Sequence, residues 1–408
     1  MNKVELLAPA GTYECAEAAF NFGADAIYIG IGQLNLRAHS PNFLIEDLPE
    51  LLELAKEKNK RVYAALNLMP DQRKIPDIKK TLANLKEKKC VPDAFIISDP
   101  GVMELCKEYL PDTELHLSTQ TGTFNLLSIN FWKKQGISRV VLPREFTVEQ
   151  IREVCSSGTM QTEIFIHGAM CVSISGRCLL GAYIGQRHPN HGDCPQPCRY
   201  KYKIELSEKN NKGSEWLDAE ESSEGVYLLN SKDLCTISVL PQLISTGVNS
   251  LKIEGRNKSA HYVASVVRVY RAAIDCFYSD PTMYKVRSEW QKELDSLDHR
   301  TYTTGFYTDE IVLQDVFSSK SQVSSRIIGV VKAVLHGGLP VIDVKNSFSA
   351  DEQLEVIPVQ QSIEPFPLFI SKITDLSGNV LERAPSSRLV LGHSEHQLRI
   401  GDMLRKRY

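Results

Sequence analysis

Residues 21–30 read NFGADAIYIG, and the pattern of this stretch recurs along the first two thirds of the chain. An amphipathic segment ends at a glycine or a turn, and a short run of β-branched residues follows and ends in polar residues. Three further copies are KCVPDAFIISD (89–99), KQGISRVVLPRE (134–145) and TGVNSLKIEG (246–255). Gly23, Gly136 and Gly247 occupy places where a helix end favours a left-handed residue. The apolar runs are short enough to be strands buried on both faces.

Eight runs of this kind alternate with helical patterns. The expected strands are residues 4–9, 26–30, 61–68, 94–99, 114–119, 139–144, 163–167 and 250–255. The expected helices are residues 12–22, 45–58, 76–88, 100–109, 126–135, 147–156, 234–245 and 259–278. Eight strand–helix units in about 275 residues predict an α/β fold, a (β/α)8 TIM-like barrel. A doubly wound open sheet is the alternative.

The composition is that of an ordinary globular protein. The chain has 408 residues, of which 42% are hydrophobic and 24% charged, and its formal net charge is −3. The start has no apolar run typical of a signal peptide, and no stretch has the length of a membrane helix, so we expect a cytoplasmic protein without a membrane partner. The net charge gives no general attraction to nucleic acid, so RNA binding would need a local basic patch.

A long insertion separates the seventh and eighth expected strands, at about residues 168–249. It holds Cys171, Cys178, Cys194 and Cys198, spaced C-x6-C-x15-C-x3-C. In a reducing compartment, ten cysteines favour metal binding, catalysis or burial over a disulfide framework. The irregular spacing at the mouth of a barrel favours a [4Fe–4S] cluster over a structural zinc ion, which usually takes closely spaced pairs, and over unliganded thiols. Cys235 could replace one of the four ligands.

The pattern changes after the barrel. We predict a barrel domain at residues 1–279, a charged helical linker at 280–324 and a small C-terminal antiparallel β-barrel domain at 325–408. The last segment lacks a helical period and alternates short strands with Gly, Pro, Asn and Ser.

Polar residues at the carboxyl ends of barrel strands are candidates for the active site. We predict catalytic roles at Arg144, His167, Lys252, Glu254 and Arg256 and substrate binding at Asn67, His116 and Gln120. The three cations among them suit an anionic small molecule. The alternative is structural: such residues could cap helices, as Asp99 could before Pro100, or sit satisfied in the core, as His116 and His167 could.

Two arginines next to the cysteines, Arg177 and Arg199, lie among Tyr183 and Tyr200 and suit contact with RNA phosphates and stacking of bases. A solvated rim is the alternative. The usual hydrolase motifs H-E-x-x-H and G-x-S-x-G and the P-loop are missing from the sequence. A cysteine nucleophile would have to be Cys171 beside His167, and this pairing competes with a ligand role for Cys171.

The stretch EIFIHGAMCVSISGRCLLGAY (163–183) resembles the signature E-x-F-x-x-G-[SA]-[LIVM]-C-x4-G-x-C-x-[LIVM]-S of the U32 peptidase-like family. It departs at the last position, where Gly181 replaces serine. Further matches are ELLAPAGT, GADAIYIG, ISDPG, HLSTQ, NHGDCPQPCRYKY, NSKDL and SLKIEGR.

This resemblance implies more than the residues show. Within the family, the length and layout are most similar to proteins that hydroxylate C5 of the wobble uridine U34 in tRNA with prephenate as the hydroxyl source. The family's cysteine motif holds a [4Fe–4S] cluster, which assigns Cys171, Cys178, Cys194 and Cys198 as ligands. It also implies that tRNA is the partner, and the C-terminal domain, with Arg405, Lys406 and Arg407, would help to hold it. A collagenase-like peptidase and a non-catalytic, cluster-stabilised RNA-binding scaffold are the alternatives.

Overall fold

The computed structural model describes residues 3–185, 187–200, 230–308, 324–362 and 364–408. Residues 201–229 of the predicted insertion and 309–323 of the predicted linker lie outside the described residues. The chain divides into two compact units. Unit 1 comprises residues 1–12, 25–257 and 299–321, and unit 2 comprises residues 13–24, 258–298 and 322–408.

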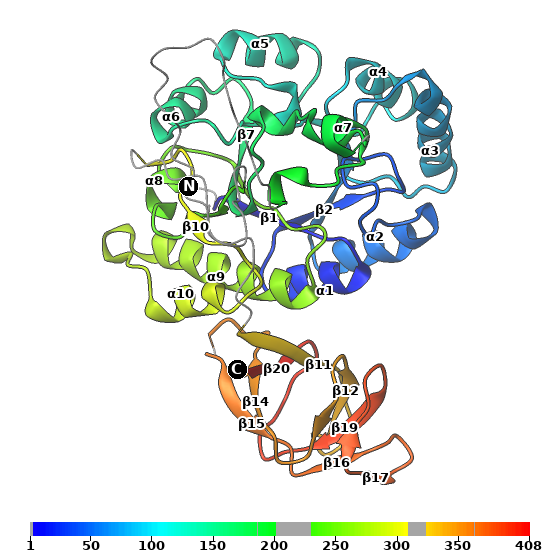
Figure 1. Ribbon diagram of the computed structural model, residues 1–408, viewed down its shortest axis with the longest axis vertical. Coiled ribbons are helices and arrows are strands. Elements are labelled where there is room, and N and C mark those ends of the chain that lie inside the picture. The colour runs from blue at the N-terminus through cyan, green and yellow to red at the C-terminus, as the bar shows by residue number, and fades with distance from the viewer. Residues whose placement is uncertain (1–2, 186, 201–229, 309–323, 363) are drawn as a thin grey trace, which may run out of the picture. The chain divides into compact units, whose positions relative to one another are not determined.

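Unit 1 contains a closed ring of eight parallel strands, as predicted (Figure 1). Each strand pairs with the next one in the chain, and β9 closes the ring because it pairs with both β1 and β7. The strands are β1 (Glu5–Pro9), β2 (Ala26–Gly30), β3 (Arg61–Leu66), β4 (Ala94–Ile97), β5 (Glu114–Leu117), β6 (Arg139–Val141), β7 (Gln161–Ala169) and β9 (Ser250–Ile253). The parallel barrel is therefore confirmed and the open sheet is wrong.

The strands have the burial that their sequences predict. All five residues of β2 are buried, as are all four of β4 and β9, so both faces of these strands are covered. Gly23, Gly136 and Gly247 have φ angles of 105°, 83° and 87°. These left-handed values confirm that each glycine follows a helix end where a side chain would be strained.

Five helices of unit 1 lie outside the ring of strands in Figure 1. They are α2 (Leu48–Glu57), α3 (Ile75–Glu87), α4 (Pro100–Tyr109), α5 (Leu126–Lys134) and α6 (Val148–Ser156). The carboxylate of Asp99 accepts a hydrogen bond from the Val102 N–H at 3.0 Å, so Asp99 is the cap of α4.

The helix expected at residues 234–245 is shorter than predicted. Residues Asp233–Cys235 form strand β8, which pairs antiparallel with the end of β7, and α8 begins only at Leu240 and ends at Ile244. Strand β10 (Tyr302–Thr303) pairs with β8. Strand β7 has nine residues and β8 pairs with its last three, so β8 extends the sheet at the end of β7, and β10 extends it further through β8.

Unit 2 contains helices α1 (Tyr13–Asn21), α9 (Ala260–Ser279) and α10 (Ser288–Asp295), together with the C-terminal strands. This division differs at α1 and α9 from the predicted domain limits, which placed both helices with the barrel. Within unit 2, Glu14 forms an ion pair with Lys345, and Glu17 with Lys332. These contacts join the first helix of the chain to the C-terminal strands.

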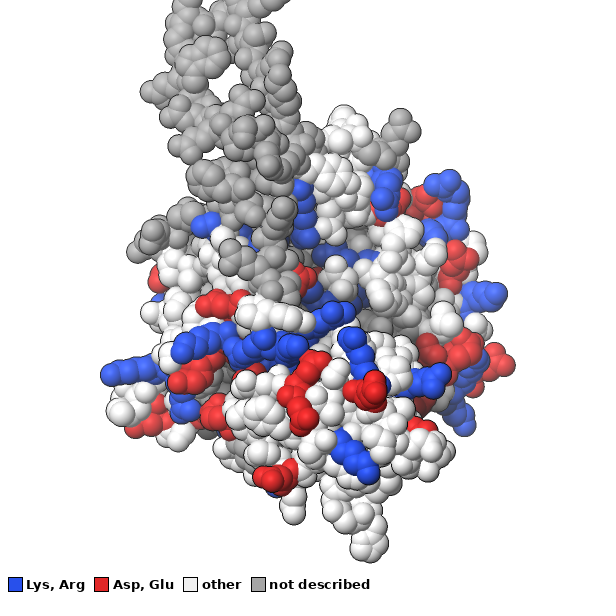
Figure 2. All heavy atoms as spheres, turned by 60° about the horizontal axis from the view of Figure 1, so that its bottom comes forward, with Lys and Arg blue, Asp and Glu red and all other residues white. Residues whose placement is uncertain are grey.

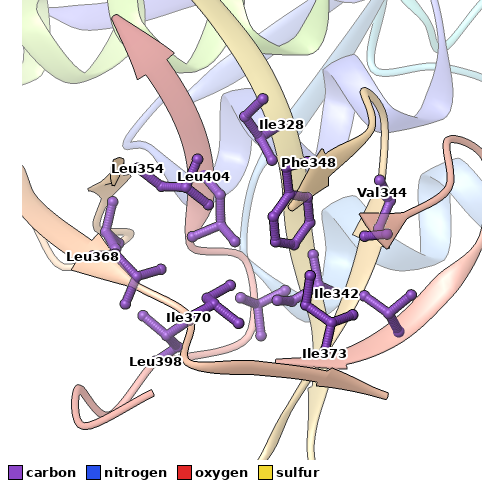
Figure 3. Close-up of a cluster of buried hydrophobic side chains, with 14 residues drawn as sticks. Ile328, Ile342, Val344, Phe348, Leu354, Leu368, Ile370, Ile373, Leu398 and Leu404 are labelled. Carbon is purple, nitrogen blue, oxygen red and sulfur yellow. The ribbon is translucent and has the colours of Figure 1, made fainter. Parts of the chain in front are cut away.

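The C-terminal strands form an antiparallel domain, as predicted. Eight of them make one sheet in the order β15-β14-β20-β11-β12-β19-β16-β17, and β13 pairs with β18. The strands are β11 (Ser325–Val334), β12 (Pro340–Val344), β13 (Phe348–Ser349), β14 (Gln353–Ile357), β15 (Phe366–Phe369), β16 (Lys372–Thr374), β17 (Val380–Leu381), β18 (Arg383–Ala384), β19 (Leu389–His393) and β20 (Met403–Arg407). Figure 3 shows side chains from several of them, with Phe348 and Ile342, converging on one apolar core.

The basic C-terminal residues are paired with acids. The Arg405 side chain is fully buried and contacts Glu293 at 2.5 Å and Glu355 at 2.6 Å, and Lys406 and Arg407 pair with Glu352 and Glu355. Figure 2 shows the same mixture of basic and acidic side chains over one face of the molecule. The expectation that Arg405 helps to hold RNA is wrong, because its charge is buried and neutralised. Within the described residues, no helix has the length and apolar character needed to cross a membrane.

Candidate active site

A network of four charged side chains, Glu5, Arg139, Glu163 and Lys252, lies inside the barrel. The Arg139 guanidinium donates to Glu5 at 2.6 Å and to Glu163 at 3.2 Å, and the Lys252 ammonium donates to Glu163 at 2.8 Å. Burial alone would raise the pKa of Glu163, but Lys252 and Arg139 hold it below its usual value. Two acidic and two basic side chains make this network neutral overall. Lys252 belongs to the network and also lines the cavity described next.

A cavity of about 570 Å³ opens next to this network, and Lys252 lines it. Its walls come from the carboxyl ends of the strands: Tyr28 lies on β2, Asn67 follows β3, Gln120 follows β5 and Arg144 follows β6. The insertion after β7 contributes the remaining wall. This is the face on which barrel enzymes place their chemistry.

One side of the cavity is cationic. Lys252 lies 4.3 Å from the centre of the Tyr28 ring, and the Arg37 guanidinium lies 3.4 Å from the Glu254 carboxylate. Arg256 donates to the side-chain oxygens of Asn35 and Asn42. Burial lowers the pKa of Arg256 to about 10, which leaves it charged at neutral pH.

Glu254 is held as a carboxylate among these cations. Burial alone would raise its pKa, but Arg37, Arg144 and Arg256 hold it below the usual value. The Tyr28 hydroxyl donates to it at 3.1 Å. Gly168 allows this arrangement because a Cβ there would lie 2.3 Å from the Glu254 carbonyl oxygen, and its φ angle is 101°.

A second part of the cavity wall, here called its polar side, has buried polar atoms with no partner among the described residues. Six buried atoms are involved: the Oγ1 of Thr119, both amide atoms of Gln120, the Nε of Arg144, the Oε2 of Glu145 and the Oγ of Ser175. Buried polar groups are costly unless they form hydrogen bonds. Six such atoms around one cavity therefore mark a place for a polar ligand.

The four cysteines of the insertion share this cavity. Cys171, Cys178, Cys194 and Cys198 all line it, and none is in a disulfide. Burial raises the pKa of the Cys198 thiol, and the thiols of Cys171, Cys194 and Cys178 raise it further, so the four groups lie within electrostatic range. Thiolate ligands suit iron–sulfur clusters, and the donor set therefore fits one. Among the described residues, no three His, Cys, Asp or Glu side chains converge as ligands of one metal ion.

The structure brings most of the predicted site residues together. Arg144, Lys252, Glu254, Arg256, Asn67 and Gln120 line the cavity with the four cysteines. Five predicted residues are not among its lining: His116, His167, Arg177, Arg199 and Cys235. His116 is buried against Tyr63, with a ring separation of 4.8 Å, and His167 is buried on β7 opposite Cys235 of β8.

Of the two predicted arginines next to the cysteines, Arg177 has a structural contact and Arg199 is partly buried. Arg177 donates from its Nε to the carbonyl oxygen of Gln120, so it holds the loop that carries Gln120. Arg199 is partly buried, and burial together with the nearby Arg300 lowers its pKa.

Sequence reasoning named Arg37 and Glu145 only among the polar residues near strand ends, and it did not select Thr119 or Ser175. Thr119 directly precedes the predicted residue Gln120, and this adjacency was the available signal. Ser175 gives no sequence signal, because its place depends on a left-handed turn at φ 49° within the insertion.

The chain matches known proteins over most of its length. Residues 11–312 match peptidase family U32, and residues 324–405 match the C-terminal domain of that family. The tRNA hydroxylation protein P1 of Bacillus subtilis is 35% identical over 94% of this chain and 89% of its own length. The tRNA hydroxylation protein P of Escherichia coli is 34% identical over 89% of this chain and 88% of its own. A collagenase of Porphyromonas gingivalis is 31% identical over 75% of this chain and 74% of its own.

Proposed function

The chain belongs to peptidase family U32, and we propose that it is a tRNA-modifying enzyme that hydroxylates C5 of the wobble uridine U34. The observation that carries this proposal is the cavity, where a cationic side, a set of unpartnered polar atoms and four cysteines meet at the catalytic face of the barrel. The names of the two tRNA hydroxylation relatives support the same class of reaction.

In this proposal a [4Fe–4S] cluster is bound by Cys171, Cys178, Cys194 and Cys198. Such a cluster supplies electron transfer when bound. The chain's own residues bind and orient the two reactants. The loop that carries Ser175 between these cysteines also forms part of the polar side of the cavity, so assembly of the cluster would order that side.

The cationic side would bind the co-substrate. Prephenate, which the family resemblance suggests, carries two carboxylates and a hydroxyl group, and Arg37, Arg144, Lys252 and Arg256 offer four cations for the carboxylates. Formally, base–H and R–OH exchange to give base–OH and R–H, which balances without dioxygen. Glu254, which Tyr28 and Arg37 position, would lie beside the reacting groups as a carboxylate that can accept a proton.

Nucleoside analysis of tRNA from cells tests the proposal. Deletion of the gene should remove the nucleosides derived from 5-hydroxyuridine at position 34, and the wild-type gene should restore them. The variants Arg144→Ala, Lys252→Ala and Arg256→Ala should fail to restore them while the proteins remain folded. Unchanged nucleosides after deletion would contradict the proposed reaction, and full activity of all three variants would favour a non-catalytic RNA-binding scaffold.

A peptidase is the second candidate, and the collagenase relative favours it. It predicts that the purified protein cleaves gelatin and that one substitution, with Cys171→Ser as the first choice, abolishes cleavage. Absence of cleavage by protein that contains its full complement of iron would reject this candidate.

A further inference from the structure

We propose that Gln120 and Glu145 recognise the Watson–Crick edge of the target base and select uridine over cytidine. This inference rests on the proposed function, which supplies the reaction but assigns no residue to the base. It starts from the polar side of the cavity, where both residues have buried side-chain atoms without a partner.

Gln120 has a fixed backbone and an uncommitted side chain. Its N–H lies 3.4 Å from the Ser118 hydroxyl, and its carbonyl oxygen accepts from the Nε of Arg177. The residue is 2% exposed, and neither atom of its side-chain amide has a partner in the structure. An amide held in this way offers one donor and one acceptor to a ligand.

Glu145 determines which class of ligand fits. Its Oε1 accepts from the Ser175 N–H at 2.8 Å, while its Oε2 is buried and has no partner among the described residues. A carboxylate ligand would be repelled by this oxygen, so the anionic co-substrate belongs on the cationic side of the cavity. The free oxygen instead requires a ligand that donates an N–H or O–H group.

Uracil meets this requirement. Its Watson–Crick edge has the N3–H donor between two carbonyl acceptors. In our assignment, Glu145 accepts from N3–H and the Gln120 amide donates to a neighbouring carbonyl. Cytosine has an unprotonated N3 at the same place, and its lone pair would face the carboxylate. Cytosine keeps the C2 carbonyl for the Gln120 amide but offers Glu145 no donor at N3, so the site disfavours cytidine by leaving the carboxylate unsatisfied.

The N3–H group can be removed from the RNA without changing the protein. We would measure binding of anticodon stem-loop RNAs with uridine, 3-methyluridine or cytidine at position 34 to the anaerobically purified, iron-loaded full chain. The wild type should bind the uridine RNA about ten- to a hundredfold more tightly than the other two, because the lost hydrogen bond has a charged acceptor.

The variants identify the residue responsible. Glu145→Gln should reduce the preference for uridine over 3-methyluridine to within about threefold, and Gln120→Leu should weaken uridine binding about tenfold. Gln72→Leu is the matched control: Gln72 is exposed in the short 3-10 helix Gln72–Lys74, and this variant should bind all three RNAs like the wild type. Because the methylated RNA is tested on the wild-type protein, the result does not depend on whether a variant folds.

Two outcomes separate this inference from the proposed function. If the wild-type gene restores hydroxylated nucleosides but the protein binds uridine and 3-methyluridine RNAs equally well, the inference is wrong and the function stands. The inference is also wrong if Glu145→Gln retains the full preference. If the wild type restores no hydroxylated nucleoside, the proposed function fails.

Discussion

The substitution Glu163→Gln tests how much the network of charged side chains in the barrel contributes to stability. The side chain of Glu163 is fully buried, with Lys252 at 2.8 Å and Arg139 at 3.2 Å. Glutamine has nearly the same shape but no charge, so the neutral set of two anions and two cations gains a net positive charge. Removing one partner of a buried ion pair costs about 3–5 kcal/mol, because the remaining charge is uncompensated.

Thermal and urea unfolding of the full chain would measure this cost. At roughly 2–4 °C per kcal/mol for a large domain, the variant should melt about 6–20 °C below the wild type. The double variant Glu163→Gln/Lys252→Met, which removes both charges, should recover part of the loss. Glu46→Gln is the control, because the Glu46–Lys88 pair is exposed, and its melting temperature should not change. A Glu163→Gln variant with wild-type stability would refute the reasoning.

Three further predictions concern the cysteines, unit 2 and the end of β7. Cys178→Ser should lower the iron content of anaerobically purified protein, whereas Cys106→Ser, which changes a buried thiol on α4, should not; equal iron in both would reject the cluster assignment. Burial alone would raise the pKa of Glu293, but Arg405 lowers it to about 2. This carboxylate therefore contributes stability above its unfolded pKa of about 4.5 and loses it as the pH falls towards 2, roughly 3 kcal/mol in all. Glu293→Gln should flatten the stability of the full chain over that pH range, and an unchanged profile would contradict the pairing. Gly168→Ala should destabilise the protein by about 1–3 kcal/mol in urea unfolding, because its Cβ would strike the Glu254 carbonyl at a left-handed φ angle. Wild-type stability of this variant would show that the backbone at the end of β7 can shift.

The barrel could be predicted because its signal is local and repeated. Each strand is a short apolar run after a helix end, and Gly136 and Gly247 mark two of those ends. Strands β8 and β10 could not be predicted, because three and two residues carry no periodicity. They depend on pairing in the assembled sheet, because β8 pairs with the end of the long strand β7 and β10 pairs with β8.

The site could be predicted only in part, for a different reason. A polar residue near a strand end is visible in the sequence, but strands of a barrel are staggered, so position along one strand does not fix the layer that a side chain enters. His116 shows this: it lies against Tyr63 and beside Glu114, and is not among the residues that line the cavity. Lys252 is only the third residue of β9, yet its side chain lines the cavity and donates from its Nζ to Glu163.

The four cations of the cavity differ in how far their charges are already balanced. Lys252 is paired with Glu163, and Arg37 with Glu254. Within the part of the chain that the structure describes, neither Arg256 nor Arg144 forms an ion pair: Arg256 donates to two neutral amides, and Arg144 lies 3.8 Å from the centre of the Phe165 ring with its Nε unpartnered. An incoming anion therefore gains most at these two residues. Because Arg144 adjoins Glu145, it lies between the sites that we propose for the anionic co-substrate and for the base, and its loss should impair binding of both. Loss of Arg256 should impair binding of the anion alone.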